Sequence, residues 1–249
     1  MAIHTREVQY HYQSHTFSGL LAWDDSLGQQ PRPAVAVAHT WAGRGDFEQG
    51  RAQALAAMGY TALALDVYGV GVRGSNPEQC QQLMAPLKAD RAQLHGRLLA
   101  GIAAMAEQPE VDASRMAAIG YCFGGLCALD LARVGAPLRS VVSLHGLFDA
   151  PEGSAVGSNT ISASVLCLHG YDDPMAAPES LLALAAEMSA AGADWQVHAY
   201  GNTVHAFTNP AANNPQMGTL YSPVADRRSW QALGNFLRET LEPAAGQAV

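Results

Sequence analysis

The feature that most constrains the fold of this chain is the glycine-framed segment Gly120-Tyr121-Cys122-Phe123-Gly124. It matches the pattern G-x-S-x-G with Cys in place of Ser, and it lies between an apolar, strand-like run at 116–119 and a helix-like run at 126–134. A chain that turns this sharply from strand to helix strains the central residue, so its flanking positions must be small. The segment therefore predicts a nucleophile elbow, with Cys122 at a helix N-terminus that favours the thiolate. The alternative is a buried structural Cys in a glycine-rich turn.

Apolar strand-like runs alternate with helical patterns along the rest of the chain. Strands are predicted at 34–38, 61–65, 116–119, 140–144, 165–168 and 195–200. Helices are predicted at 47–58, 78–84, 86–107, 126–134, 178–191 and 223–241. Residues 6–12 and 16–23 alternate in polarity and predict an antiparallel hairpin at a sheet edge. This order predicts one α/β domain over 1–249, with a doubly wound, mostly parallel sheet and helices on both faces.

The charge of the chain restricts its partners. It has 14 basic and 22 acidic residues, a net charge of −8, and no basic cluster, which disfavours nucleic acid and anionic membranes. The start has no apolar signal-like segment and no run is long enough to span a membrane, so we expect a cytoplasmic protein. Its 4 Cys form neither a C-x-x-C pair nor a disulfide framework, which suits a reducing compartment.

Polar or glycine-rich clusters follow the predicted strands, where parallel sheets gather function. These clusters are 39–43, 66–71, 120–125, 145–146, 169–174 and 201–207. They supply Cys122, then an Asp, then His205, which is the order nucleophile, acid, base. Cys122 would attack an acyl carbon, and His205 would take the thiol proton and later protonate the leaving group or activate water. Asp172 and Asp173 both qualify as the carboxylate that orients His205.

At these clusters the chain resembles the dienelactone hydrolase family of α/β-hydrolases. The resemblance is most specific at 120–125, 169–174 and 204–210. It implies the α/β-hydrolase fold and a Cys-His-Asp triad. The family's acid stands in a Gly-x-x-Asp turn, so the resemblance points to Asp173, followed by Pro174, and leaves Asp172 as a solvated turn residue.

Two N–H groups are expected to bind the oxyanion of the reacting acyl group. One is that of Phe123, the residue after the nucleophile, and the other lies in the loop after the predicted strand 34–38. The resemblance places the second donor at Trp41. The glycines nearby, Gly43 and Gly45, favour Trp41 as the wall of a pocket over Trp41 as a core residue.

The chain departs from the family where the substrate is bound. Dienelactone hydrolases carry an Arg two residues after the Tyr that matches Tyr68, and another four residues after the catalytic His. Here those positions hold Val70 and Asn209, and only Arg73 is close enough in sequence to substitute. We therefore expect a neutral or weakly polar ester or lactone. The alternatives are an anionic dienelactone, as for a carboxymethylenebutenolidase, and a thiol-based redox function.

The substrate pocket is expected to include Thr40, Tyr68, Arg73, His145 and Phe207. Thr40 aligns with a family Glu that helps to generate the thiolate, and Thr40 cannot act in that way. His145 could line the pocket or be structural, whereas His39 and His169 are expected to bond to loop backbone. No ligand spacing predicts a metal, and no glycine motif with the right context predicts a dinucleotide, so no cofactor is expected. A monomer and a homodimer both remain open.

Overall fold

The computed structural model describes residues 2–28, 30–152 and 160–242. The chain divides into two compact units, Met1–Ile119 and Gly120–Val249, with the boundary inside strand β5 (Val111–Tyr121). Each unit is described by itself. The single domain expected over 1–249 stays a prediction.

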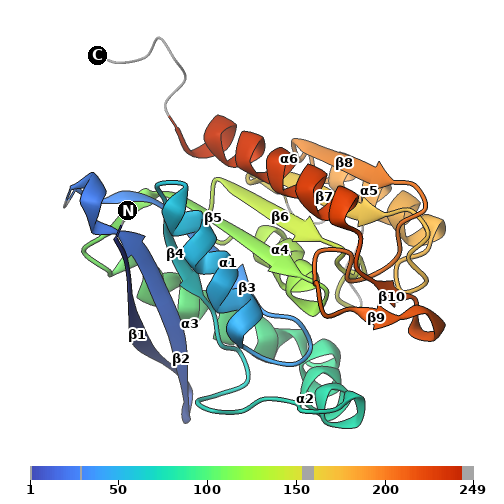
Figure 1. Cartoon of the computed structure of the whole chain (residues 1–249), viewed down its shortest axis with the longest axis horizontal. Coiled ribbons are helices and arrows are strands. Elements are labelled where there is room, and N and C mark those ends of the chain that lie inside the picture. The colour runs from blue at the N-terminus through green and yellow to red at the C-terminus, as the bar shows by residue number, and fades with distance from the viewer. Residues whose placement is uncertain (1, 29, 153–159, 243–249) are drawn as a thin grey trace. The chain divides into compact units, whose positions relative to one another are not determined.

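The first unit is built on a hairpin and a set of buried strands (Figure 1). Strands β1 (Ile3–Tyr12) and β2 (His15–Asp24) pair antiparallel, which confirms the predicted hairpin. Strand β2 also pairs antiparallel with β4 (Thr61–Ala64), which pairs parallel with β3 (Arg32–Ala38). The order in this unit is β1-β2-β4-β3-β5.

The helices of the first unit are α1 (Asp46–Ala57), α2 (Pro77–Ala89) and α3 (Arg91–Ala106). Helix α1 packs against β2, β3 and β4, and α3 packs against β1 and β3. The predicted break at Pro86 is wrong, because α2 continues through Pro86 and the next helix begins after Asp90. The Asp90 side chain accepts a hydrogen bond from Gln93 N at 3.0 Å, and this cap sets the boundary. Pro86 lacks the N–H for an intrahelical bond, and α2 ends three residues later, at Ala89.

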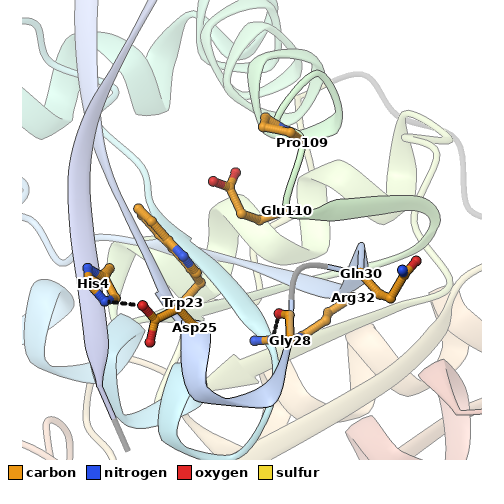
Figure 2. Close-up of a pocket in the computed structure, with 8 residues that line it drawn as sticks. All are labelled: His4, Trp23, Asp25, Gly28, Gln30, Arg32, Pro109 and Glu110. Atoms are coloured by element: carbon orange, nitrogen blue, oxygen red, sulfur yellow. Dashed lines mark hydrogen bonds and ion pairs between the residues drawn. The ribbon is translucent and has the colours of Figure 1, made fainter.

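A small cavity of about 370 Å³ lies beside the outer hairpin, near the start of β5 (Figure 2). Its charged side chains already have partners. His4 Nε2 lies 2.6 Å from Asp25 Oδ2, and Arg6, which stacks 4.9 Å from the ring of Trp23, binds both carboxylate oxygens of Glu110. These pairs connect the hairpin to the residue before β5, so we assign the cavity a structural role.

The second unit contains the parallel strands β6 (Ser140–Leu144), β7 (Ser164–Gly170) and β8 (Trp195–Tyr200), in that order. Its helices are α4 (Phe123–Arg133), α5 (Pro178–Ala190) and α6 (Pro223–Leu241), and α6 packs across β6 and β7 (Figure 1). The Ser222 hydroxyl accepts from Ala225 N at the start of α6, and Pro223 follows as the first helical residue, which is a common N-terminal cap.

The sequence did not predict a short hairpin between β8 and α6. It consists of β9 (Asn213–Asn214), the 3₁₀ turn η2 (Pro215–Met217) and β10 (Thr219–Leu220). The sequence at 149–163 is rich in Gly, Ser and Pro and predicts a loop, of which residues 153–159 lie outside the described residues. The sequence also predicts a C-terminal tail at 242–249, of which residues 243–249 lie outside the described residues.

Most of the parallel strands are buried on both faces, whereas β8, at the end of the strand order, is partly exposed. Every residue of β4 and β6 is buried, and so are Ala34–Ala38 of β3. Parallel strands covered on both faces read as continuous apolar runs, which is why these strands were predictable. The described residues include no helix whose length and apolar character would let it span a bilayer.

Candidate active site

The predicted elbow forms at the end of β5. Cys122 is the N-cap of α4 and has φ 58° and ψ −117°, a strained conformation for a residue with a side chain. A Cβ on Gly120 would overlap the carbonyl of Gly124 and lie 2.8 Å from Gly125 N. The turn therefore depends on the absence of a side chain at Gly120.

The start of α4 lies close to the end of β6. A Cβ on Gly125 would lie 2.6 Å from both Gly146 Cα and Ser143 Oγ. The N–H of Cys122 donates to Leu144 O at 3.1 Å, so this N–H is engaged in holding the turn. The Cys122 side chain is half-buried and can be reached from solvent. Phe123 begins the helix at the point where backbone N–H groups have no intrahelical acceptor.

His205 is paired with Asp173. Its Nδ1 lies 2.7 Å from Asp173 Oδ2, and the two side chains are 2% and 0% exposed. The other carboxylate oxygen of Asp173 accepts from Met175 N at 2.8 Å. Asp172 is exposed, and its N–H donates to Thr203 O. Of the two candidate acids, the structure thus brings Asp173 to His205.

The charge on His205 depends on Cys122. Burial is the largest single effect and lowers the pKa of His205. The negative charge on Cys122 and the hydrogen bonding to Asp173 and to the sulfur together outweigh burial and raise the pKa to about 10. The charge on Cys122 has a larger effect on the pKa of His205 than the hydrogen bond to the sulfur has, so charge is the main link between the two groups.

His145 packs against His205, and Phe207 packs against His145. The rings of His145 and His205 meet edge-on with centroids 5.2 Å apart, and Phe207 packs on His145 at 5.1 Å. His145 Nε2 lies 2.8 Å from Thr208 Oγ1. His145 is 1% exposed and Phe207 is 0% exposed. Both are thus buried, and their place in the substrate pocket stays a prediction.

The other histidines at strand ends differ from one another. His39 is bonded to loop backbone as predicted, with Nδ1 2.6 Å from Thr40 O and Nε2 accepting from Val67 N. For His169 the same prediction is wrong, because neither ring nitrogen has a hydrogen-bond partner among the described residues. Its ring lies 5.1 Å from that of Phe148, and burial lowers the pKa of His169.

The remaining expected site residues lie in loops of the first unit. Tyr68 OH donates to Trp41 O at 2.9 Å, so Tyr68 fixes the peptide of Trp41. Thr40 N donates to Glu48 Oε1 at 3.1 Å. The exposed Arg73 packs its guanidinium where a side chain at Gly45 would lie.

Glu48 was missed by sequence reasoning. It is 2% exposed, and its second oxygen accepts from Gly45 N at 2.9 Å. A Glu three residues after the N-cap Gly45 is the position of a capping box, and that spacing could have revealed it.

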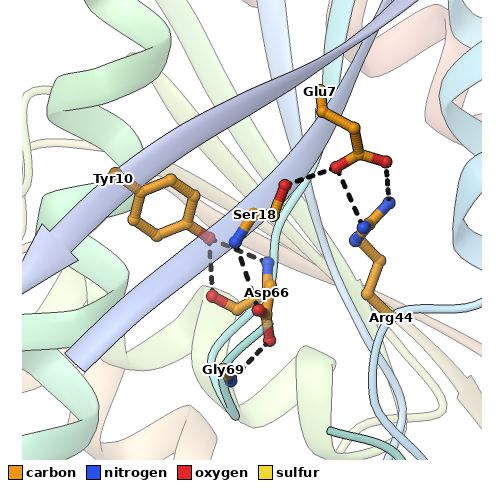
Figure 3. A network of polar contacts seen from close by, with 6 residues as sticks. All are labelled: Glu7, Tyr10, Ser18, Arg44, Asp66 and Gly69. Atoms are coloured by element: carbon orange, nitrogen blue, oxygen red, sulfur yellow. Dashed lines mark hydrogen bonds and ion pairs between the residues drawn. The ribbon is translucent and has the colours of Figure 1, made fainter. Parts of the chain in front are cut away.

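A polar network holds the loop that carries Tyr68 (Figure 3). The buried Asp66 accepts from Tyr68 N and Gly69 N through one oxygen, both at 2.9 Å, and from Ser18 N at 3.2 Å through the other. Tyr10 OH, in turn, accepts from Asp66 N at 2.8 Å. The loop after β4 is thus tied to β1 and β2.

No group of three or more His, Cys, Asp or Glu among the described residues is arranged to hold a metal ion.

The fold is that of an α/β-hydrolase. It has a mostly parallel sheet, Cys122 lies at a strand-to-helix elbow, and a His and an Asp are paired in later loops. The model of the dienelactone hydrolase family matches residues 17–241, so this chain belongs to that family and is a hydrolase.

Two similar solved structures each cover nearly the whole chain. The solved structure of m3DLH is 38% identical, covers 97% of this chain and 100% of its own, and superposes with a TM-score of 0.91. A dienelactone hydrolase-like promiscuous phosphotriesterase from metagenomic libraries is 37% identical, covers 96% and 99%, and has a TM-score of 0.89. The uncharacterized protein K02A2.1 of Caenorhabditis elegans is 34% identical over 159 residues, which are 61% of this chain and 98% of that protein.

Proposed function

We propose that this hydrolase cleaves carboxylic esters or lactones through a thioester on Cys122. His205 acts as general acid and base, and Asp173 orients it. The observation that carries the proposal is the buried 2.7 Å pairing of His205 with Asp173, together with the effect of the Cys122 thiolate on the charge of His205.

Each group has a defined task in this reaction. The thiolate of Cys122 attacks the acyl carbon, and protonated His205 gives its proton to the departing alcohol oxygen. Neutral His205 then takes a proton from the water that attacks the thioester, and the thiolate leaves. Asp173 accepts from Nδ1–H of His205 throughout and so keeps Nε2 available for these transfers.

The oxyanion is bound by backbone N–H groups in this proposal. Because the N–H of Cys122 donates to Leu144 O, the donor from the elbow is the N–H of Phe123. We assign the second donor to the N–H of Trp41, whose carbonyl is fixed by Tyr68.

The substrate is proposed to be a neutral or weakly polar small molecule. Val70, which is 54% exposed, and Asn209 stand where the family carries cations for a substrate carboxylate. The net charge of −8 also disfavours anionic partners, so we expect no nucleic acid or membrane partner. The proposed location is the cytoplasm.

A burst experiment tests the mechanism. Mixing the enzyme with a p-nitrophenyl acyl ester should give a burst of p-nitrophenolate that is abolished in Cys122→Ala and in His205→Ala. Ester hydrolysis that persists in Cys122→Ala would contradict the proposal. Consumption of peroxide without ester turnover would favour the redox alternative. A kcat/KM higher for a carboxylated lactone than for its uncharged analogue would favour the anionic substrate.

Hydrolysis of phosphotriesters is a second candidate activity. The 37% identical relative is described as a promiscuous phosphotriesterase, and a thiolate beside N–H donors can also attack an activated phosphorus centre. An uncharged p-nitrophenyl phosphotriester should then be cleaved by the wild type and not by Cys122→Ala.

A further inference from the structure

The short hairpin β9–η2–β10 holds the main chain of His205 on both sides. His205 N donates to Gly218 O at 3.0 Å, and Leu220 N donates to His205 O at 3.2 Å. His205 and Thr219 form a β-bridge. The position of the imidazole is therefore set by the hairpin as well as by Asp173.

Gly218 is the residue of this hairpin that also meets the loop of the acid. It ends η2 with φ 68° and ψ 30°, in the left-handed region. A Cβ on Gly218 would lie 2.7 Å from Pro174 Cδ and closer still to Pro174 Cγ. Pro174 directly follows Asp173. Gly218 therefore lies against the loop that carries Asp173, and its carbonyl accepts the hydrogen bond from His205 N.

We propose that Gly218 is a positioning residue that couples His205 to the turn carrying Asp173. The inference rests on the proposed function of His205. Because Gly218 has no side chain, Pro174 can approach the hairpin closely, and the two backbones are held where the 2.7 Å hydrogen bond can form. A methyl group at 218 would have to displace the rigid ring of Pro174 or the carbonyl that holds His205. Both movements alter the acid–base pair.

The test compares two glycines with the same backbone conformation. Gly192, after α5, has φ 67°, and a Cβ built on it meets nothing within 4 Å. Gly192→Ala and Gly218→Ala therefore share the conformational strain, whereas only Gly218→Ala creates the collision with Pro174. We expect Gly218→Ala to lower kcat by about tenfold or more, since small misplacements of catalytic groups have large effects. Gly192→Ala should leave kcat unchanged.

A second substitution makes the test specific to the contact. Pro174→Ala removes Cγ and Cδ, so the double variant Gly218→Ala/Pro174→Ala should recover most of the activity lost in Gly218→Ala. Recovery of folding by the double variant would also support the proposal if Gly218→Ala alone were unstable. If Gly218→Ala lowered kcat equally in the wild-type and the Pro174→Ala background, the proposal would be overturned.

The hydrogen bond itself can be measured without turnover. The Nδ1–H proton of His205, identified by its loss in His205→Gln, should give a downfield NMR resonance in the wild type and in Gly192→Ala. We expect it to shift or broaden in Gly218→Ala and to return in the double variant. An unchanged resonance in Gly218→Ala would overturn the coupling. Persistent ester hydrolysis in Cys122→Ala would instead overturn the proposed function and leave the coupling standing.

Discussion

Asp173 Oδ2 lies 2.7 Å from His205 Nδ1, and the other oxygen of Asp173 accepts from Met175 N at 2.8 Å. Each oxygen of this fully buried carboxylate thus has its own donor. The arrangement fixes the direction of the imidazole and favours the tautomer in which Nδ1–H donates a hydrogen bond to Asp173.

Replacing Asp173 should therefore impair catalysis. Because its side chain is buried, the substitution leaves the protein surface nearly unchanged. An amide in Asp173→Asn can present N–H to Nδ1 of His205 and favour the wrong tautomer, which should lower kcat by about 100-fold or more. The matched control is Asp172→Asn, which alters an exposed neighbour. Steady-state kinetics on one p-nitrophenyl ester would compare them, and equal losses in the two variants would contradict the assignment of Asp173.

The pKa of His205 should fall when the thiolate is removed. A raised pKa means that protonation of His205 stabilises the folded state. This contribution is complete below pH 6.5 and is lost as the pH rises through about 10. In Cys122→Ala the charge that most raises the pKa is absent, so His205 should lose its proton at lower pH. NMR titration of the imidazole would measure the shift, and urea unfolding across this pH range would follow the stability. An unchanged pKa in Cys122→Ala would mean that the sulfur is uncharged.

Asp66→Ala should destabilise the first unit. It removes the acceptor of three N–H groups, those of Ser18, Tyr68 and Gly69, and a buried donor left without a partner costs about 1–3 kcal/mol. Asp66→Asn keeps one acceptor oxygen, so its free energy of unfolding should lie between those of the wild type and Asp66→Ala. Urea unfolding measures the difference, with the exposed Asp194→Ala as control. Equal midpoints for Asp66→Ala and the control would show that the network contributes nothing.

Arg133→Met should destabilise the second unit. Arg133 is 8% exposed, binds Glu187 through two nitrogens at 2.7 Å, contacts Asp130 at 3.0 Å and donates to Phe148 O. Removing one partner from a buried ion pair costs about 3–5 kcal/mol, because the other charge stays buried. The control is Arg227→Met on the exposed face of α6. The double variant Arg133→Met/Glu187→Met should recover part of the loss, and its failure to do so would argue against charge as the cause.

The sequence predicted those parts of the fold that depend on local patterns. Strands β6 and β8 begin and end where the apolar or alternating runs do, and α6 begins at its Ser-Pro cap. The elbow was predictable because Gly120 approaches the backbone of Gly124 too closely for a side chain at 120. The pairing of His205 with Asp173 followed from their places at the ends of predicted strands and from the resemblance.

Features that depend on tertiary contacts were not predictable in this way. The hairpin strands β9 and β10 are two residues long, too short for alternation of polarity to appear. His145 is buried because Thr208 satisfies its Nε2, a bond between distant residues. Phe207 is buried because it packs on His145 and Tyr200. Polar residues at strand ends thus predict where the site lies, whereas the burial of His145 and Phe207 depends on tertiary contacts.

The strained conformation of Cys122 is imposed by main-chain contacts, through the approach of Gly120 to Gly124 and the bond from Cys122 N to Leu144 O. None of these contacts involves the atom at the tip of the side chain. A Ser at this position, which differs by one atom, would be presented in the same direction by the same turn. The chemistry of the proposed intermediate and the backbone that presents the proposed nucleophile are therefore separable. A single substitution would change the chemistry and retain the backbone.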